Sequence, residues 1–221
     1  MSRLSSPSIT QGAYERLRAD LLHGALVPGQ KLKLNELCET MGINLSAMRE
    51  ALSRLSAEGL VTAEPQRGFR AAPLQAEELR DLAEARVEIE VSCLRRSISA
   101  GDLEWESRLV AATHRLLHLP TEAERPTHDL SEAWRQAHAD FHAALCAACP
   151  NRWLLRLREQ LFVQSERYRR LSVPLSVRER DINNEHKGLL DAALARNVDL
   201  ASQLMEDHLR RTAAILLGTP G

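Results

Sequence analysis

Four histidines have the spacing of a shared binding site. His138 and His142 stand four residues apart in AWRQAHADFHAALCAAC, so a helix there places both on one face, about one turn apart. His186 and His208 lie at equal distances along the chain from Asn197, where we predict a break between two helices. The antiparallel hairpin that results would set both side chains roughly 16 Å from the turn, at about 1.5 Å rise per residue.

Four imidazoles brought together from three helices could hold a metal. Imidazole nitrogens are ligands for Zn, Ni, Cu and Fe, and a site of this kind can keep open positions for a ligand or water. The alternative is that these are surface residues or satisfied core residues, as isolated histidines in helical bundles usually are. The remaining four have no such convergence, and we interpret them as surface or interhelical residues: His23, His114, His118 and His128.

Cys146 and Cys149 form a C-x-x-C pair on the predicted helix that carries His138 and His142. The spacing occurs in redox and zinc sites, but the sequence has no second pair of this kind. Cysteines three residues apart on a helix are mostly small buried residues, and this is the interpretation that we favour.

A second group of residues with functional side chains lies in the N-terminal part of the chain, for which a different fold is predicted. Helices are predicted at residues 10–23, 34–41 and 44–58, and two β-prone runs follow at 60–63 and 69–72. Three short helices followed by a small hairpin predict a winged helix-turn-helix, whose third helix enters the major groove of DNA.

Several side chains of this unit could contact DNA. Ser46 and Arg49, near the start of the third helix, can bond to bases or phosphates. Arg67 and Gly68 form the tip of the hairpin, where glycine permits close approach to the backbone or minor groove. The alternative is a small protein-interaction module without a role in DNA binding.

From Ala76 the pattern is helical nearly to the end of the chain, with about six helices before residue 217. Pro73 is a reasonable joint between the two patterns. We therefore predict a mainly α protein with two domains, a winged helix-turn-helix at residues 1–74 and an antiparallel all-α helical bundle at residues 75–221.

The composition is that of an ordinary globular protein. Of the 221 residues 44% are hydrophobic and 27% charged, whereas only 4% are aromatic, which argues against an all-β fold. No apolar run approaches the roughly 20 residues of a membrane span, and the first residues contain no apolar signal region, so we expect a cytoplasmic protein. Residues 1–74 carry nine basic and seven acidic side chains, and the rest carry 20 and 23. Residues 1–74 are thus slightly basic and the rest of the chain is acidic, which is compatible with DNA binding by residues 1–74.

Residues 13–74 contain three further motifs: G-x-L-x-PG-x-x-L in GALVPGQKL, REAL-x-RL-x-x-EGLV in REALSRLSAEGLV, and the RG of the wing. By these motifs the segment resembles the GntR family of bacterial transcription regulators. This resemblance implies a homodimer that binds a palindromic operator. The DNA contacts of the family fall at Asn35, Leu45, Ser46, Arg49, Arg67 and Gly68.

Two of these positions depart from the common pattern. Leu45 stands where an arginine is frequent, and Asn35 occupies a position that some members fill with arginine. A leucine side chain cannot hydrogen-bond a base and can at best touch a thymine methyl group. We therefore expect an operator that differs from the commonest one of the family.

Residues 78–217 resemble the FCD ligand-binding domain, which accompanies GntR heads in the FadR subfamily. Its metal-binding branch has the motifs D-x-x-x-H, EH-x-x-(I/L)-x-x-A and a final H-L, which FHAAL, EHKGLLDAALARN and EDHL match. The resemblance implies that His142, His186 and His208 are metal ligands, with His138 in the place of the usual aspartate. Replacing a carboxylate by an imidazole should favour zinc or nickel over manganese. Asp140 is no easy substitute, because it lies two residues on and points away from the histidine face.

The same resemblance implies a small carboxylate effector, held with the help of the metal. Arg86 matches an effector-binding arginine of the family, and a guanidinium suits bidentate capture of a carboxylate. Arg86 could alternatively pair only with Glu90, one turn further on. The stretch QSERYRRLS resembles a branch linked to glutarate and other short-carboxylate catabolism, and there Ser165 and Arg167 are candidate pocket residues.

We therefore predict a DNA-binding transcription regulator, a repressor, whose operator affinity a small carboxylate controls at the histidine-rich metal site. One alternative is a metal-dependent enzyme on a helical bundle, but the sequence has no Glu-x-x-His pair of the di-iron type and no nucleophile–base arrangement. The other is an effector-independent DNA-binding protein.

Overall fold

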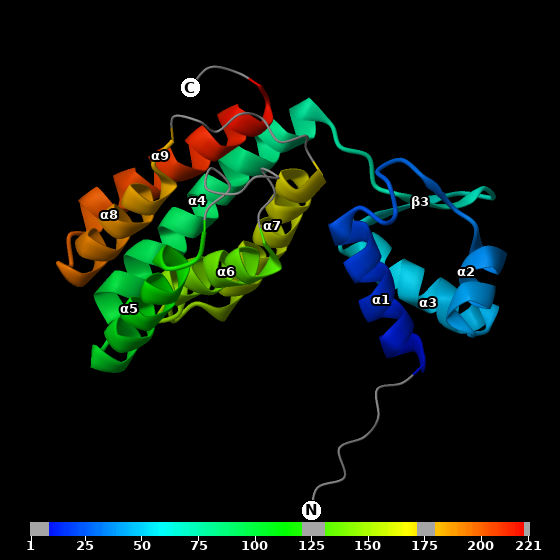
Figure 1. Ribbon diagram of the computed structural model, residues 1–221, viewed down its shortest axis with the longest axis horizontal. Coiled ribbons are helices and arrows are strands. Elements are labelled where there is room, and N and C mark those ends of the chain that lie inside the picture. Colours follow the sequence, from blue (N-terminus) through cyan, green and yellow to red (C-terminus); the bar gives the residue numbers. More distant parts are fainter. Residues whose placement is uncertain (1–8, 121–130, 172–179, 219–221) are drawn as a thin grey trace, which may run out of the picture. The chain divides into compact units, whose positions relative to one another are not determined.

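A computed structural model describes residues 9–120, 131–171 and 180–218 (Figure 1). The chain divides into two compact units. The winged-helix unit comprises Met1–Glu78 together with Val163–Leu171, and the helical unit comprises Leu79–Phe162 together with Ser172–Gly221. The boundary predicted after residue 74 lies close to the first division. The sequence did not indicate that part of a later helix belongs to the first unit.

The winged-helix unit contains the three predicted helices and a small sheet. Its elements are α1 (Ile9–His23), β1 (Lys31–Leu32), α2 (Leu34–Met41), α3 (Leu45–Ala57), β2 (Val61–Glu64) and β3 (Gly68–Ala71). The sheet is antiparallel with strand order β1-β3-β2, so the hairpin is extended by β1, a strand of two residues that the sequence did not predict. The core between the helices and the sheet contains Leu17, Met48, Leu52, Leu55 and Leu60, all fully buried.

Local sequence signals explain the helix-turn-helix. Gly42 ends α2 in the left-handed region with φ of 64°, where a residue without Cβ is favoured. Asn44 then caps α3, because its side chain accepts a hydrogen bond from the Ala47 backbone nitrogen at 2.9 Å. The turn of the wing also needs a positive φ, which Gly68 supplies at 94°.

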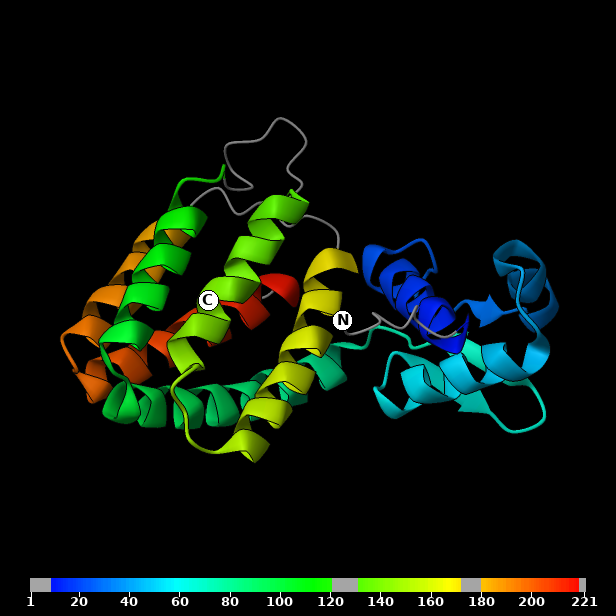
Figure 2. The same cartoon turned by 90° about the horizontal axis from the view of Figure 1, so that it is seen from below.

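The helical unit contains the helices expected after the joint. They are α4 (Ala76–Ala100), α5 (Leu103–Leu117), α6 (Glu132–Cys146), α7 (Arg152–Leu171), α8 (Ile182–Leu194) and α9 (Val198–Leu216). The first three residues of α4 and the second half of α7 belong to the winged-helix unit. Within the helical unit α5 packs against α6 and α8, and α8 against α9 (Figures 1 and 2). The predicted mainly α fold with a wing and a helical bundle is confirmed.

Two turns show why the helices of this unit meet as they do. The predicted break at Asn197 is present, since its side chain caps α9 by accepting a hydrogen bond from the Leu200 nitrogen at 3.1 Å. Gly101, between α4 and α5, leaves room for the indole of Trp105, which would lie 2.2 Å from a Cβ at that position.

None of the described helices is long and apolar enough to cross a membrane. His128 lies outside the described residues.

Candidate metal centre and DNA-binding surface

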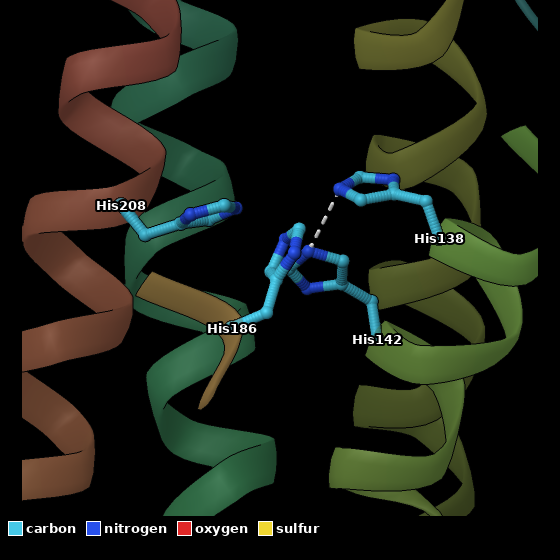
Figure 3. A group of neighbouring side chains, drawn as sticks. All are labelled: His138, His142, His186 and His208. Carbon is cyan, nitrogen blue, oxygen red and sulfur yellow. Dashed lines mark hydrogen bonds between the residues drawn. The ribbon is translucent and has the colours of Figure 1, made fainter. Parts of the chain in front are cut away.

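The structure brings the four predicted histidines together inside the helical unit. His138 and His142 extend from α6, His186 from α8 and His208 from α9, and the four rings point toward one another (Figure 3). One potential ligand atom from each lies within 4.8 Å of the others. The Nε2 atoms of His138 and His142 are 3.1 Å apart. The hairpin argument therefore placed the two distant histidines at the correct level.

All four side chains are buried, with exposed fractions of 0 to 4%. Burial lowers the pKa of His208 to about 4, although the hydrogen bond to Glu185 opposes this shift. Burial and the neighbouring charges of His208 and Arg86 lower the pKa of His142 well below its usual value. His142 and His208 are therefore neutral at pH 7, which is the form that binds a metal.

The geometry fits a transition metal. Zinc binds imidazole nitrogen at about 2.0–2.1 Å, so two ligands of a tetrahedral ion lie about 3.4 Å apart. The Nε2 atoms of His138 and His142 are near this separation at 3.1 Å, and a ligand atom of each of the other two histidines lies within 4.8 Å of them. His142 Nδ1 is buried and has no hydrogen-bond partner among the described residues. A donor set of four neutral imidazoles without a carboxylate suits zinc or nickel better than manganese.

A carboxylate outside the cluster orients one of its rings. The Nδ1 atom of His208 lies 2.8 Å from Glu185 Oε2, so an N–H donated there leaves Nε2 available as a ligand. Glu185 is held in turn by Arg180 at 2.6 Å and by Arg211 at 2.7 Å. Although burial alone would raise the pKa of Glu185, the hydrogen bond from His208 and the Arg180 guanidinium keep it well below its usual range.

Arg86 belongs to a buried charge cluster in the same unit. Its Nη2 atom lies 3.4 Å from Glu90 Oε1 on α4, which agrees with the alternative that Arg86 pairs with Glu90. Both side chains are buried. Arg158 of α7 donates to the second oxygen of Glu90 at 2.9 Å. Arg158 also lies 3.6 Å from the carboxylate of Glu159, whose side chain is 65% exposed. Arg158 Nη2 is buried and has no hydrogen-bond partner among the described residues.

Phe162 connects this charge cluster with the histidines. The guanidinium carbons of Arg86 and Arg158 lie 5.1 and 5.4 Å from the centre of its ring. The rings of His138 and His142 are 6.4 and 6.3 Å from the same ring centre. The two arginines therefore lie one aromatic ring away from the candidate metal ligands.

The other two predicted effector residues lie elsewhere. Ser165 and Arg167 belong to the winged-helix unit, on the second half of α7. Arg167 Nη2 donates to the backbone oxygens of Ala72 and Pro73, at 2.7 and 2.5 Å. The Arg167 side chain is thus occupied in holding the segment after the wing.

The cluster has partners that the sequence did not reveal. The indole of Trp134 stacks on His138 with ring centres 4.8 Å apart. Glu185 precedes His186 directly in the sequence, which is the signal that could have drawn attention to it. The sequence gave no signal for Arg158 or Phe162. Arg158 is far along the chain from Glu90, and Phe162 is far from His138 and His142, so only tertiary packing joins them. Asp140 accepts a hydrogen bond from Gln136, so it is not part of the cluster, as expected.

The predicted DNA-contacting residues share the helix-turn-helix and wing. Asn35 on α2, Leu45, Ser46 and Arg49 on α3, and Arg67 in the turn before β3 are all exposed, and Gly68 is partly exposed. The N-terminal end of α3 therefore presents two polar side chains and Leu45, which is 43% exposed. An exposed leucine there is consistent with a contact surface.

Comparison with known proteins agrees with both units. Residues 9–70 match the model of bacterial regulatory proteins of the gntR family, and residues 81–211 match the FCD domain. The chain is 37% identical over 95% of its length to the HTH-type transcriptional regulator BphR of Paraburkholderia xenovorans, of which the match covers 85%. It is 35% identical over 89% of its length to the HTH-type transcriptional repressor GlaR of Escherichia coli, of which the match covers 90%.

A solved structure of a GntR transcriptional regulator from Rhodococcus has the same fold. Its TM-score is 0.75 at 22% identity, and the match covers 97% of this chain and all of that one. These relatives are regulators, so the alternative of a metal-dependent enzyme is excluded. The chain belongs to the GntR family of bacterial regulatory proteins, and it is a DNA-binding transcription regulator with a C-terminal FCD domain.

Proposed function

We propose that this regulator is a repressor whose operator affinity is controlled by a small carboxylate at a metal held by His138, His142, His186 and His208. The observation that carries the proposal is the convergence of four buried imidazoles on one point. A bound zinc or nickel ion would supply a Lewis-acid contact for a carboxylate oxygen. The relative named as a repressor supports the direction of regulation.

The charge cluster beside the histidines supports an anionic effector. Arg86 and Arg158 lie against Phe162 beside the histidines, and Arg158 Nη2 is buried without a hydrogen-bond partner among the described residues, so this guanidinium would bind a carboxylate. Arginine binds carboxylates through two parallel N–H groups, which also fixes their orientation. We therefore keep Arg86 as an effector ligand and add Arg158, whereas Arg167 donates to the backbone oxygens of Ala72 and Pro73.

On the DNA side we propose a homodimer on a palindromic operator. The contacts would come from Asn35, Leu45, Ser46, Arg49, Arg67 and Gly68, and from their copies in the second subunit. The winged helix-turn-helix at residues 1–74 and the bundle at residues 75–221 would act as the DNA-binding and the effector-binding domain. A location in the cytoplasm follows from this function.

A thermal-shift screen tests the effector proposal. Metal-loaded and chelator-treated protein are melted with short mono- and dicarboxylates, because a ligand at about 100 times its Kd adds roughly 2.7 kcal/mol of stability. We expect one acid class to raise the melting temperature only when metal is bound. The Arg86→Ala variant should lose the shift, and the exposed Arg108→Ala variant should keep it. If no acid shifts the metal-loaded protein, an effector-independent DNA-binding protein is the better description.

A further inference from the structure

A network of hydrogen bonds surrounds the Nδ1 atom of His208. It joins Arg180, just before α8, and Glu185, in the first turn of α8, to His208 and Arg211 on α9. The side chains of Arg180, Glu185 and His208 are 7, 16 and 3% exposed. The network is thus largely withdrawn from water, where hydrogen bonds are electrostatically stronger than in solution.

The carboxylate of Glu185 has a partner at each acceptor position. Its Oε1 atom accepts from Arg180 Nε at 2.9 Å and from Arg211 Nη1 at 2.7 Å. Its Oε2 atom accepts from Arg180 Nη2 at 2.6 Å and lies 2.8 Å from His208 Nδ1. An ionised carboxylate offers about four acceptor positions and no donor, so a hydrogen on Nδ1 completes the set. The two parallel bonds from Arg180 fix the plane of the carboxylate.

Arg180 is a second neighbour of Nδ1, since its Nη2 atom lies 3.1 Å away. A guanidinium only donates, so this contact would require a hydrogen-free Nδ1 and would place the imidazole hydrogen on Nε2. The two hydrogens of Nη2 have other acceptors, which are Glu185 Oε2 and, at 3.2 Å, the backbone oxygen of His208. None remains for Nδ1. Therefore Nδ1 is the donor and Glu185 is its acceptor.

We propose that Glu185 is a positioning residue for the metal, because it holds His208 in the tautomer with hydrogen on Nδ1 and leaves Nε2 to bind the ion. This inference rests on the proposed metal site. Histidine ligands commonly donate their second nitrogen to a carboxylate, and loss of such a partner costs about 10–100-fold in metal affinity. Glu185 directly precedes His186, so one turn of α8 provides a ligand and also supports the ligand on α9.

Arg180 supports this arrangement from outside. Its Nη1 atom donates to Thr212 Oγ1 at 3.0 Å, and Thr212 Oγ1 donates to the backbone oxygen of His208 at 2.8 Å. Arg180 therefore contacts Glu185, the His208 backbone and the next turn of α9 together. The ring of His208 is held in this way both through its side chain and through its backbone.

The tautomer can be measured directly in metal-free protein. Full-length protein with isotope-labelled histidine is treated with chelator, and long-range proton–nitrogen correlation spectra identify the ring nitrogen that carries the hydrogen. The His208 signal is assigned by its loss in the His208→Gln variant. We expect the hydrogen on Nδ1 of His208. Hydrogen on Nε2, or a mixture of both forms, would overturn the proposal whether or not the protein binds a metal.

Metal affinity tests the consequence. Zinc is titrated into chelator-stripped protein in competition with a coloured chelator of known affinity. We expect Glu185→Gln to raise the Kd for zinc by about 10–100-fold, because the amide lacks the charge and can donate to Nδ1. The matched control is Glu206→Gln on α9, which removes a carboxylate that is 40% exposed and lies 2.7 Å from Arg210 Nη1. The Kd of this control should equal that of the wild type.

The outcomes separate this inference from the proposed function. Equal zinc affinity of Glu185→Gln and wild type would overturn the role of Glu185 and leave the metal site standing. A wild type that binds no zinc would contradict both. Melting curves of the chelated proteins check that Glu185→Gln is folded. Because the spectra use the wild-type protein, the tautomer is tested even if this variant does not fold.

Discussion

His138 is the residue that most distinguishes the candidate metal centre. The family resemblance implies an aspartate there, and the imidazole removes one negative charge from the donor set. Its Nε2 atom nevertheless lies 3.1 Å from that of His142, so a potential ligand atom is present at this point of α6. We therefore expect a metal that accepts four nitrogen ligands, and zinc and nickel both do so.

Replacing His186 and His208 together by alanine should remove the bound metal. The two remaining imidazoles both come from α6, and two ligands rarely hold a divalent ion tightly. Elemental analysis of purified protein measures the metal per chain. The matched control is the His114→Ala/His118→Ala double variant, which loses an exposed histidine pair at the C-terminal end of α5 and should keep its metal. Stoichiometric metal in the first variant would refute the site.

The buried histidines also predict how the metal-free protein responds to acid. Burial lowers the pKa of His208 from 6.5 to about 4, so below pH 6.5 the unfolded chain takes up a proton that the folded chain does not. The contribution to stability is thus fully present above pH 6.5 and is lost as the pH falls toward 4. Urea unfolding of chelated protein should show a lower midpoint at pH 5 than at pH 7. The His208→Gln variant should show a smaller decrease, and an equal decrease would contradict the assignment.

At the scale of single residues, the sequence predicted which histidines converge better than it predicted the residues that contact them. Periodicity sufficed for His138 and His142, and a symmetric hairpin sufficed for His186 and His208. It could not predict that Arg158 pairs with Glu90, because the two residues are 68 positions apart and only tertiary packing joins them. Arg167 was predicted to bind the effector because the stretch QSERYRRLS resembles a carboxylate-linked branch of the family. In the structure its guanidinium donates instead to backbone oxygens of the winged-helix unit, a tertiary contact that the sequence does not reveal.

Among the elements, α3 carries the proposed readout of the operator. Arg49 is exposed on α3 and packs into no core, so its removal should not affect folding. Arg49→Ala should cost roughly 1–3 kcal/mol of specific binding, which is about tenfold or more in affinity. Footprinting and anisotropy with operator DNA measure the loss, and the melting temperature checks the fold. Arg108→Ala on α5 serves as the arginine control, and an unchanged footprint for Arg49→Ala would exclude the role.

Helix α7 belongs to both units, and its second half stabilises the winged helix. Arg167 donates to the Ala72 and Pro73 oxygens, and Gln164 Nε2 donates to the Glu58 oxygen. Arg167→Ala leaves two backbone acceptors without this donor and should lower the free energy of unfolding by about 1–3 kcal/mol. Denaturant unfolding measures the change. Arg156→Ala, an exposed arginine on the same helix, should be nearly neutral, and equal effects of the two variants would contradict the assigned contacts.

The elements themselves were largely predictable where a local signal marked their ends. Gly42, Asn44 and Asn197 each terminate or cap a helix through their own backbone or side-chain chemistry. By contrast, β1 is only two residues long and exists because it pairs with β3, about forty residues later. The division of α7 between two units is likewise a property of tertiary contacts, because its sequence is continuously helical.

For the whole molecule, regulation requires that the effector binds two states of the protein with different affinity. A carboxylate bound beside the histidines and arginines can change the operator affinity only by as much as its own affinity differs between the two states. The GntR and FCD assignments establish the two binding partners in kind, an operator and a small effector. The four-histidine cluster is the feature through which we propose that they are coupled.

The most direct test of this coupling is the Kd for operator DNA measured by fluorescence anisotropy. The operator is selected by the protein from random duplexes, and the acid is the one with the largest thermal shift. In metal-loaded protein the acid should change the Kd by about 5–150-fold, corresponding to 1–3 kcal/mol of coupling. In chelator-treated protein it should leave the Kd unchanged. The same Kd with and without acid in metal-loaded protein, or the same change in chelated protein, would contradict the account.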